Sequence, residues 1–214
     1  MSKSTPYKYI AIEGNIGAGK TSLAKILATK FNSALVLEEF AENTFLPQFY
    51  DHPERFAFPL EMSFLAERFQ QILSEQKKSL EKNQLLIGDY IFEKSLLFAR
   101  VNLKGAEMIL FSKFYDLIAK DLQKPDLILY LHKETDLLLK NISLRGRTYE
   151  QSIPSDYLEQ VSQQYLNHLQ SIDNQRIIIL KSDHLDFVNE HNDLIYILDL
   201  LKDEHPKKVL NICP

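Results

Sequence analysis

The sequence has little of what builds disulfide scaffolds, flexible linkers or membrane spans. Its 214 residues include one cysteine, Cys213, and only six glycines. A lone cysteine forms no disulfide within the chain, which excludes a disulfide-stabilised scaffold. No run reaches the roughly 18 apolar residues of a membrane helix, so we expect no membrane partner. The start, MSKSTPYKY, lacks the apolar stretch of a signal peptide, and we therefore expect a cytoplasmic protein.

The charge balance argues against a nucleic acid polymer as partner, because a formal net charge of −4 offers DNA or RNA no general attraction. With 45% hydrophobic residues, a chain of this length can bury one full core. The sequence has no internal repeat, low-complexity segment or linker. We therefore expect one domain over residues 1–204, and a C-terminal tail, residues 205–214, that lies loosely on the surface.

Apolar runs and amphipathic stretches alternate along the chain, which is typical of a wound α/β domain. The apolar runs predict five short parallel strands, at residues 7–12, 33–37, 84–87, 127–131 and 177–180. The amphipathic stretches predict helices at residues 21–31, 55–80, around 95, 108–122, 135–144, 156–169 and 192–202. The expected architecture is a five-stranded parallel sheet flanked by helices.

Three of the six glycines fall within one short stretch, where the backbone must have a special task. Residues 14–21 read GNIGAGKT, which fits G-x-x-x-x-G-K-[ST] between a strand and a helix. In such a loop backbone N–H groups cradle phosphates, Lys20 reaches the β- and γ-phosphates and Thr21 ligates Mg²⁺. The residues expected to bind the nucleotide are Gly14, Asn15, Ile16, Gly17, Ala18, Gly19, Lys20, Thr21 and Ser22. An ordinary glycine-rich turn is the alternative, and the motif alone leaves GTPases, motor ATPases and small-molecule kinases open.

A pair of carboxylates follows the second predicted strand, in the sequence LVLEEF. Glu38 and Glu39 would lie at the same sheet edge as the phosphate loop, where open parallel sheets bind their ligands. A kinase that acts on an alcohol gains from a carboxylate that accepts the hydroxyl proton, and Glu38 is the candidate for this base. Solvated surface carboxylates are the alternative.

Two arginines lie in the segment LRGRTYEQSIP between two predicted helices. Arg145 and Arg147, separated by Gly146, are placed to fold over a triphosphate and stabilise the charge that develops during transfer. Exposed arginines that merely favour the helix dipole are the alternative, and the segment alone does not decide between the two.

With these motifs in place, the chain resembles the deoxynucleoside kinase family, and within it the bacterial deoxyadenosine and deoxyguanosine kinases. The resemblance spans nearly the whole chain and rests on GNIGAGKTS, the strand end at Glu38, NTFLPQFY, LEMSFLAERFQQ, KPDLILYL and RGRTYEQSIPSDYLEQV. It implies a three-layer sandwich with an arginine-bearing lid. It also implies transfer of the γ-phosphoryl group of ATP, with Mg²⁺, to the 5′-hydroxyl of a deoxynucleoside.

The resemblance further implies roles for single residues. Glu38 would be the base, with Glu39 secondary, and Asp89 would offer a carboxylate near Mg²⁺. Tyr50 and Glu150 would hold the sugar 3′-hydroxyl, although a packed ring and a surface carboxylate remain the plain alternatives. Arg145 and Arg147 would grip the donor phosphates. Family members pair through helices near residues 96–101 and 108–118, so we expect a homodimer.

Two departures from the family pattern bear on the substrate. The family arginine after the third strand is replaced by Tyr90, and Lys94, one helical turn later, is the candidate to restore its charge. In the base pocket a family glutamine is replaced by Glu61, with Arg68 seven residues on and Ser95 in place of a family aspartate. A carboxylate only accepts hydrogen bonds and a guanidinium only donates them, which favours purines and suits guanine best, unless the two form a plain surface ion pair.

Other activities stay open at this point. A nucleoside monophosphate kinase would need more cations at the acceptor, and a nucleotide-binding regulatory module would have lost efficient chemistry with the missing arginine. The sequence leaves undecided the preferred base, ATP or GTP as donor, feedback inhibition and any fusion partner.

Overall fold

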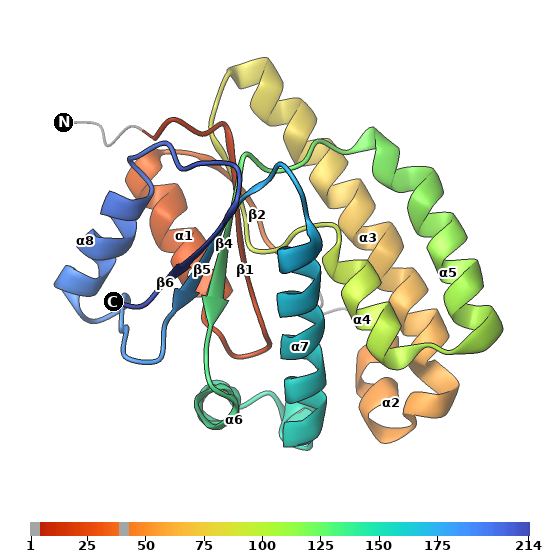
Figure 1. Ribbon diagram of the computed structural model, residues 1–214. Coiled ribbons are helices and arrows are strands. Elements are labelled where there is room, and N and C mark those ends of the chain that lie inside the picture. Colours follow the sequence, from red (N-terminus) through yellow and green to blue (C-terminus); the bar gives the residue numbers. More distant parts are fainter. Residues whose placement is uncertain (1–4, 39–42) are drawn as a thin grey trace.

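The computed structural model describes residues 5–38 and 43–214, and Glu39 lies outside them. It contains a six-stranded, all-parallel sheet in the order β2-β3-β1-β4-β5-β6 (Figure 1). The strands are β1 (Tyr9–Gly14), β2 (Ala34–Val36), β3 (Leu86–Gly88), β4 (Leu127–His132), β5 (Arg176–Lys181) and β6 (Val209–Ile212). The helices are α1 (Lys20–Phe31), α2 (Phe45–Asp51), α3 (Pro53–Lys82), α4 (Lys94–Asn102), α5 (Gly105–Ile118), α6 (Thr135–Arg145), α7 (Ser155–Ser171) and α8 (His191–Leu200), with short 3-10 helices at Ala119–Asp121 and Thr148–Glu150.

The sheet is covered on both faces, which gives the predicted three layers. Figure 1 shows α1 and α8 on one face and α3, α4, α5 and α7 on the other. Because successive strand residues point to opposite faces, Tyr9 and Ala11 of β1 join the core under α3 to α7, whereas Ile10 and Ile12 join the core under α1 and α8. All four are buried. Apolar side chains on both faces explain why the strands read as continuous apolar runs.

Several helices end where the sequence supplies a residue that tolerates a left-handed backbone. Asn32 after α1 has φ 52°, Asn83 after α3 has φ 47°, and Gly146 after α6 has φ 72°. All three N–H groups bond back to carbonyls near the end of the helix that they follow. Asparagine and glycine are the residues that most readily take this conformation at a helix C-terminus. The ends of α1, α3 and α6 are thus encoded locally.

The sequence missed two elements of the fold. Residues 205–214 do not all lie loosely on the surface, because Val209–Ile212 form β6 and pair in parallel with β5. This strand has only four residues, too few for periodicity to separate it from an apolar stretch of coil. The helix α2 was also not predicted, since its seven residues include a proline and show no helical repeat.

The strands shorten from the middle of the sheet to its edges. The central strands β1, β4 and β5 have six residues each, whereas the edge strands β2 and β6 have three and four. Within the part of the chain that the structure describes, no helix is both long and apolar enough to cross a membrane.

Candidate active site

The phosphate loop connects β1 to α1, and its shape depends on two glycines. Gly17 and Gly19 have φ angles of 83° and 93°, in the left-handed region that favours glycine. A Cβ atom on Gly17 would also lie 2.7 Å from the backbone oxygen of Leu138. The Lys20 ammonium donates to the Asn15 carbonyl, 2.9 Å away. The loop therefore has the wrapped backbone of a phosphate cradle, with its lysine held against it.

Two asparagine side chains attach this loop to neighbouring helices. Asn15 Nδ2 donates to the Leu158 carbonyl and to the Ser162 hydroxyl of α7, both at 2.7 Å. Asn141 Nδ2 of α6 donates to the Gly17 carbonyl at 2.8 Å. The predicted nucleotide-binding residues 14–22 thus form one loop and the first turn of α1, held from α6 and α7.

Buried charges surround the lysine of the loop. Burial and the neighbouring Lys94 lower the pKa of Lys20 to about 8, although Glu13 opposes the shift. The Glu13 carboxylate is itself fully buried and accepts hydrogen bonds from the N–H groups of Gly14, at 2.9 Å, and Ile91, at 2.8 Å. Glu13 therefore ties the end of β1 to the segment after β3, which carries Asp89.

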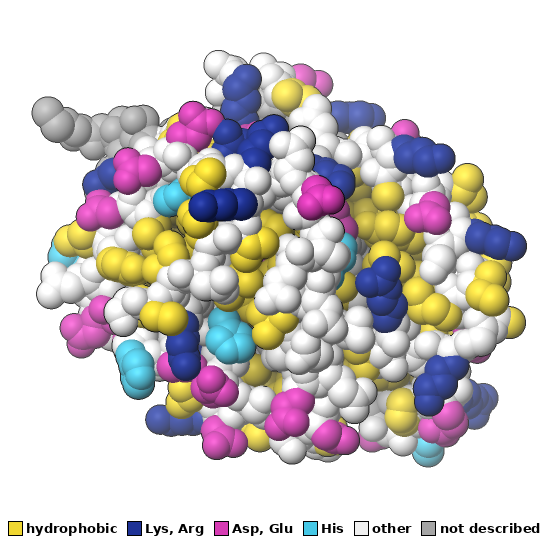
Figure 2. All heavy atoms as spheres, in the orientation of Figure 1, with side chains coloured by type: hydrophobic (Ala, Val, Ile, Leu, Met, Phe, Trp, Pro, Cys, Tyr) yellow, Lys and Arg dark blue, Asp and Glu magenta, His cyan; other side chains and the backbone are white. Residues whose placement is uncertain are grey.

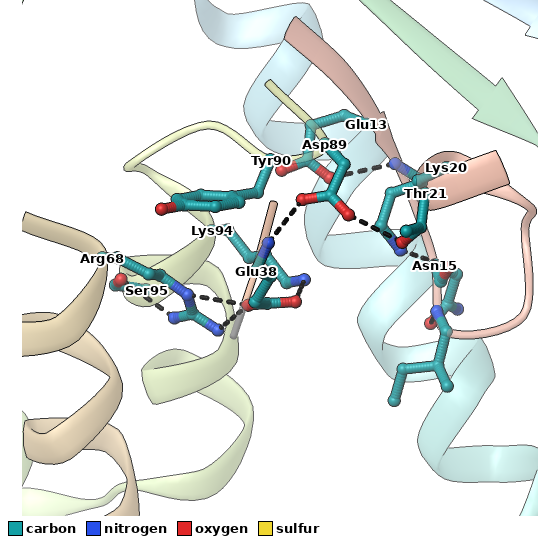
Figure 3. Close-up of polar contacts among 12 residues, drawn as sticks. Glu13, Asn15, Lys20, Thr21, Glu38, Arg68, Asp89, Tyr90, Lys94 and Ser95 are labelled. Atoms are coloured by element: carbon teal, nitrogen blue, oxygen red, sulfur yellow. Dashed lines mark hydrogen bonds and ion pairs between the residues drawn. The ribbon is translucent and has the colours of Figure 1, made fainter. Parts of the chain in front are cut away.

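The metal-binding residues named from the sequence lie together. Asp89 Oδ2 accepts a hydrogen bond from Thr21 Oγ1 at 2.6 Å, and Asp89 Oδ1 accepts from the Glu38 N–H at 2.8 Å (Figure 3). Burial, and then Glu38, raise the pKa of Asp89. Hydroxyl and carboxylate oxygens are ligands that suit Mg²⁺. Among the described residues no three His, Cys, Asp or Glu side chains gather as a group that could hold a metal ion.

The candidate base Glu38 is held between two cations from different helices. Arg68 of α3 donates to Glu38 Oε1 from Nε at 2.9 Å and from NH2 at 2.7 Å, and Lys94 Nζ of α4 contacts Oε2 at 2.6 Å (Figure 3). The Glu38 side chain is 9% exposed, Arg68 3% and Lys94 6%. Burial alone would raise the pKa of Glu38, but Lys94 and Arg68 outweigh it and hold this pKa well below its usual range. The carboxylate is therefore ionised.

The residue in place of the family arginine does not contact Glu38 through a polar group. Tyr90 is fully buried, and its hydroxyl donates to Gln71 Oε1 at 2.8 Å. Lys94, four residues later, does contact Glu38, as Arg68 does. Tyr90 thus joins the segment after β3 to α3, and Lys94 stays the candidate for the charge of the missing arginine.

Glu61 of α3 is 1% exposed and meets the last residue of α4, Asn102, whereas Glu38 meets the first, Lys94. Its Oε1 accepts a hydrogen bond from Asn102 Nδ2 of α4 at 2.6 Å, whereas its Oε2 has no partner among the described residues. Burial raises the pKa of Glu61 to about 7, with Arg68 opposing. The surface ion pair allowed by the sequence is wrong, because both side chains are buried and Arg68 bonds to Glu38 and to the Ser95 hydroxyl, at 2.9 Å.

The lid segment brings its arginines onto a predicted sugar ligand. Glu150 is buried in the short helix after α6, and its two carboxylate oxygens accept from Arg145 and from Arg147, the latter at 3.1 Å. Tyr50 of α2 stacks on Tyr149 with ring centres 6.2 Å apart. The lid is thus closed onto α2 by a ring stack, and its arginine charges face a carboxylate.

One pocket joins these groups. It is lined by the loop residues Ile16, Lys20 and Thr21, the base Glu38, and the predicted substrate ligands Tyr50, Glu61, Arg68 and Glu150, together with Lys94, Arg145 and Arg147. Asp89 lies behind it, bonded to Thr21. Phe64, which from the sequence was expected to pack in the core or to form a wall for the nucleoside base, also lines it, and among the other lining residues the sequence indicated no role for Phe98, Asn102 and Tyr157. The α4 residues among them follow Lys94 at intervals of four, and this spacing was the signal that could have found them.

Comparisons with known proteins agree with this geometry. The family model described as "Deoxynucleoside kinase" matches residues 10–204. The deoxyguanosine kinase of Bacillus subtilis is 36% identical over 199 residues, which cover 91% of this chain and 96% of that protein. The deoxyadenosine kinase of Lactobacillus acidophilus is 30% identical over 217 residues, covering 95% of this chain and 98% of that protein.

Solved structures share the fold. The deoxyadenosine kinase from M. mycoides with bound dCTP has a TM-score of 0.78 to this chain at 22% identity, covering 90% of this chain and 98% of that one. The family model matches most of the chain, the relatives align over nearly their whole length, and the fold is shared, so this chain belongs to the deoxynucleoside kinase family.

Proposed function

We propose that this protein transfers the γ-phosphoryl group of ATP to the 5′-hydroxyl of a purine deoxynucleoside, giving the monophosphate for nucleotide salvage. The observation that carries the proposal is the buried Glu38 carboxylate. It lines the same pocket as Lys20 of the phosphate loop, so that a proton acceptor and a phosphate-binding cation face one cavity. Family membership supports the nucleoside as acceptor, and relatives named deoxyguanosine and deoxyadenosine kinase support a purine.

In the proposed reaction the 5′-oxygen forms a bond to the γ-phosphorus while the bond from this phosphorus to the β,γ-bridging oxygen breaks. The electron pair of the broken bond leaves on ADP, and the hydroxyl proton passes to Glu38. A carboxylate with a low pKa suits this task, because a loose transition state needs little activation of the nucleophile and releases its proton late. To accept the hydroxyl, Glu38 must give up its contact with one of the two cations. The other cation then still holds the carboxylate.

Cations account for the rest of the chemistry. Thr21 and Asp89 would hold Mg²⁺, which when bound neutralises charge on the phosphate oxygens. Lys20 faces the donor phosphates, and its pKa rises again beside them since anions favour its charged form. Arg145 and Arg147 turn from Glu150 to the donor, which leaves Glu150 and Tyr50 for the sugar 3′-hydroxyl.

The geometry disfavours a nucleoside monophosphate as acceptor. The cations near the acceptor are already paired, Arg68 and Lys94 with Glu38, and Arg145 and Arg147 with Glu150. An acceptor phosphate would have to draw cations away from these carboxylates, and taking one partner from a buried ion pair is costly. A neutral deoxynucleoside meets no such cost.

We further propose that the protein is a cytoplasmic homodimer. Helix α5 exposes four large hydrophobic side chains, Ile109 at 61%, Leu110 at 44%, Phe114 at 43% and Leu117 at 66%. The last three recur at helical spacing and form one stripe. Figure 2 shows hydrophobic surface over α5 at the right edge of the molecule. A second copy would cover this stripe; light scattering should give twice the chain mass, and Phe114→Glu should give monomer.

The decisive test is phosphate transfer from Mg·ATP to the four deoxynucleosides and, separately, to their monophosphates. We expect transfer to purine deoxynucleosides and none to monophosphates. Lys20→Ala serves as the control, since it removes the phosphate-binding cation and should abolish transfer from this site. Transfer to monophosphates alone, or ATP binding without transfer to any acceptor, would overturn the proposal in favour of a monophosphate kinase or a regulatory module.

A further inference from the structure

The Glu61 carboxylate raises a chemical question that the proposed reaction does not answer. Its Oε2 is buried and lacks a hydrogen-bond partner among the described residues, although Glu61 lines the acceptor pocket. A buried carboxylate oxygen without a donor is costly, and such atoms in native proteins call for a specific explanation. A ligand that donates a hydrogen bond at this point would satisfy it.

The surroundings of Glu61 have the form of a site for a planar base. Glu61, Phe64 and Arg68 recur on one side of α3, and a span of seven residues covers about 10 Å of helix. Phe64 lies between the two charged residues and lines the pocket, as do Phe98 of α4 and Tyr157 of α7. Aromatic faces of this kind pack against flat rings. Asn102 Nδ2 holds Glu61 Oε1 at 2.6 Å and fixes the direction of the carboxylate.

Resting on the proposed function, we infer that Glu61 selects guanine, by accepting hydrogen bonds from its N1–H and 2-amino groups. These two donors are adjacent on the base, and a carboxylate presents two acceptors side by side. Among the bases of DNA only guanine pairs an N–H in the ring with a neighbouring amino group. Guanine therefore supplies a donor to Oε2 without taking Oε1 from Asn102, since each oxygen accepts more than one bond.

Adenine and cytosine fit this carboxylate poorly. Each presents one amino group beside an unprotonated ring nitrogen, which is an acceptor. An ionised Glu61 would place an acceptor against that nitrogen. A site built to bond a donor discriminates strongly against analogues that lack it, because its buried polar group is then left unpaired.

The test compares four nucleosides with wild-type protein at pH 8, above the Glu61 pKa of about 7, so that the carboxylate is ionised: deoxyguanosine, deoxyinosine, deoxyadenosine and deoxycytidine. Deoxyinosine keeps the N1–H and loses only the 2-amino group, without added bulk. We expect kcat/KM to fall from deoxyguanosine through deoxyinosine to the other two, with deoxyadenosine about 100-fold below deoxyguanosine. Equal use of deoxyadenosine and deoxyguanosine would overturn the inference while leaving the proposed kinase activity intact.

Glu61→Gln tests the residue itself. Its amide keeps the shape of the side chain but offers one donor and one acceptor, the complement of the adenine edge. We expect kcat/KM for deoxyguanosine to fall about 100-fold, mostly through KM, and that for deoxyadenosine to rise. Glu75→Gln, the same change on α3 outside the pocket, should alter neither value. An unchanged KM for deoxyguanosine in Glu61→Gln would overturn the inference.

Direct binding separates this inference from the proposed function. Titration calorimetry of deoxyguanosine into wild type and Glu61→Gln needs no phosphate transfer. Weaker binding in the variant, with no turnover in either protein, would support the guanine site and overturn the kinase. Binding that is equal in both proteins would overturn the guanine site, whatever the turnover.

Discussion

The two ends of the pocket hold carboxylates that share burial and differ in charge. Glu38 meets Arg68 and Lys94 within 2.9 Å, and its pKa lies well below the usual range. Glu61 has an asparagine for its one hydrogen-bond partner among the described residues, and its pKa rises to about 7. Burial acts in the same direction on both, so the number of cations in contact decides the outcome. Glu38, at the reaction end of the pocket, is therefore ionised, whereas Glu61, at the nucleobase end, can gain or lose a proton near neutral pH.

The largest expected effect is at the reaction end. Glu38→Gln removes the proton acceptor, and we expect kcat to fall by about 10³-fold, a usual contribution of a general base. Single-turnover assays with the best deoxynucleoside would measure it. Because the change leaves Arg68 and Lys94 around a neutral amide, thermal unfolding should be followed in parallel. A kcat within tenfold of wild type would mean that Glu38 binds substrate without taking its proton.

The second effect is a pH dependence of the free energy of unfolding that arises from Glu61, at the nucleobase end. The folded-state pKa of Glu61 is raised from an ordinary 4.5 to about 7, so the folded protein binds this proton more tightly. The contribution of Glu61 to the free energy of unfolding is therefore complete below about pH 4.5 and is lost as the pH rises through 7. We expect the free energy of unfolding of wild type to fall relative to Glu61→Gln across this range, by up to roughly 3 kcal/mol.

Other groups bear on this titration and define its control. Those that act on Glu61 are Arg68 on its own helix, Glu38 after β2, and Lys94 and the Asn102 amide on α4; the Tyr157 hydroxyl of α7 also interacts with it. Glu38 adds nothing to the slope above pH 5, since its lowered pKa moves its titration to more acidic solution. Denaturant unfolding of both proteins between pH 5 and 8 would show the difference; parallel curves would contradict it.

A smaller effect is expected at Lys94, the candidate to restore the charge of the missing family arginine. Lys94→Ala leaves Glu38 with Arg68 alone, and we expect kcat to fall about 30-fold, near the 2 kcal/mol of a charged hydrogen bond. The acid limb of the pH profile should also move to higher pH, because one cation no longer lowers the pKa of Glu38. Lys94→Arg should restore part of kcat. Wild-type turnover in Lys94→Ala would show that the charge is not needed.

The smallest effect separates Tyr90 from the chemistry. Tyr90→Phe removes the hydrogen bond to Gln71, and we expect a loss of about 1 kcal/mol in the free energy of unfolding, with kcat within about threefold of wild type. A double-mutant cycle with Gln71→Ala would attribute the loss to this bond. A large fall in kcat would instead place Tyr90 in the reaction.

The sequence predicted which residues meet at the reaction end better than which meet at the nucleobase end, for a physical reason. The phosphate loop and Glu38 follow strands, and parallel strands bring their carboxyl ends to one edge whatever the details of packing. The strand and helix positions were confirmed to within a few residues. Residues on α3 and α4 are different, because their partners depend on how two helices meet. Arg68 was paired with Glu61 by spacing along one helix, yet in the structure it reaches across to Glu38.

Asn102 and β6 were missed for related reasons. Asn102 has a role only because α4 lies against Glu61 of α3, and nothing local in its own segment marks it. The strand β6 forms because the edge of β5 offers a row of backbone groups. Contacts made by distant segments are set by the assembled fold, and patterns of one segment do not contain them.

The taper of the sheet bears on how the protein behaves at high concentration. An exposed strand edge is a template for pairing with another chain, and its danger grows with its length. Here the two edges have three and four residues, so each offers only a short row of donors and acceptors to a neighbour. The last edge strand ends two residues before Pro214, a residue that cannot extend a ladder. The longer apolar strands lie between these edges and have no free edge of their own. We therefore expect little edge-to-edge aggregation of the folded protein.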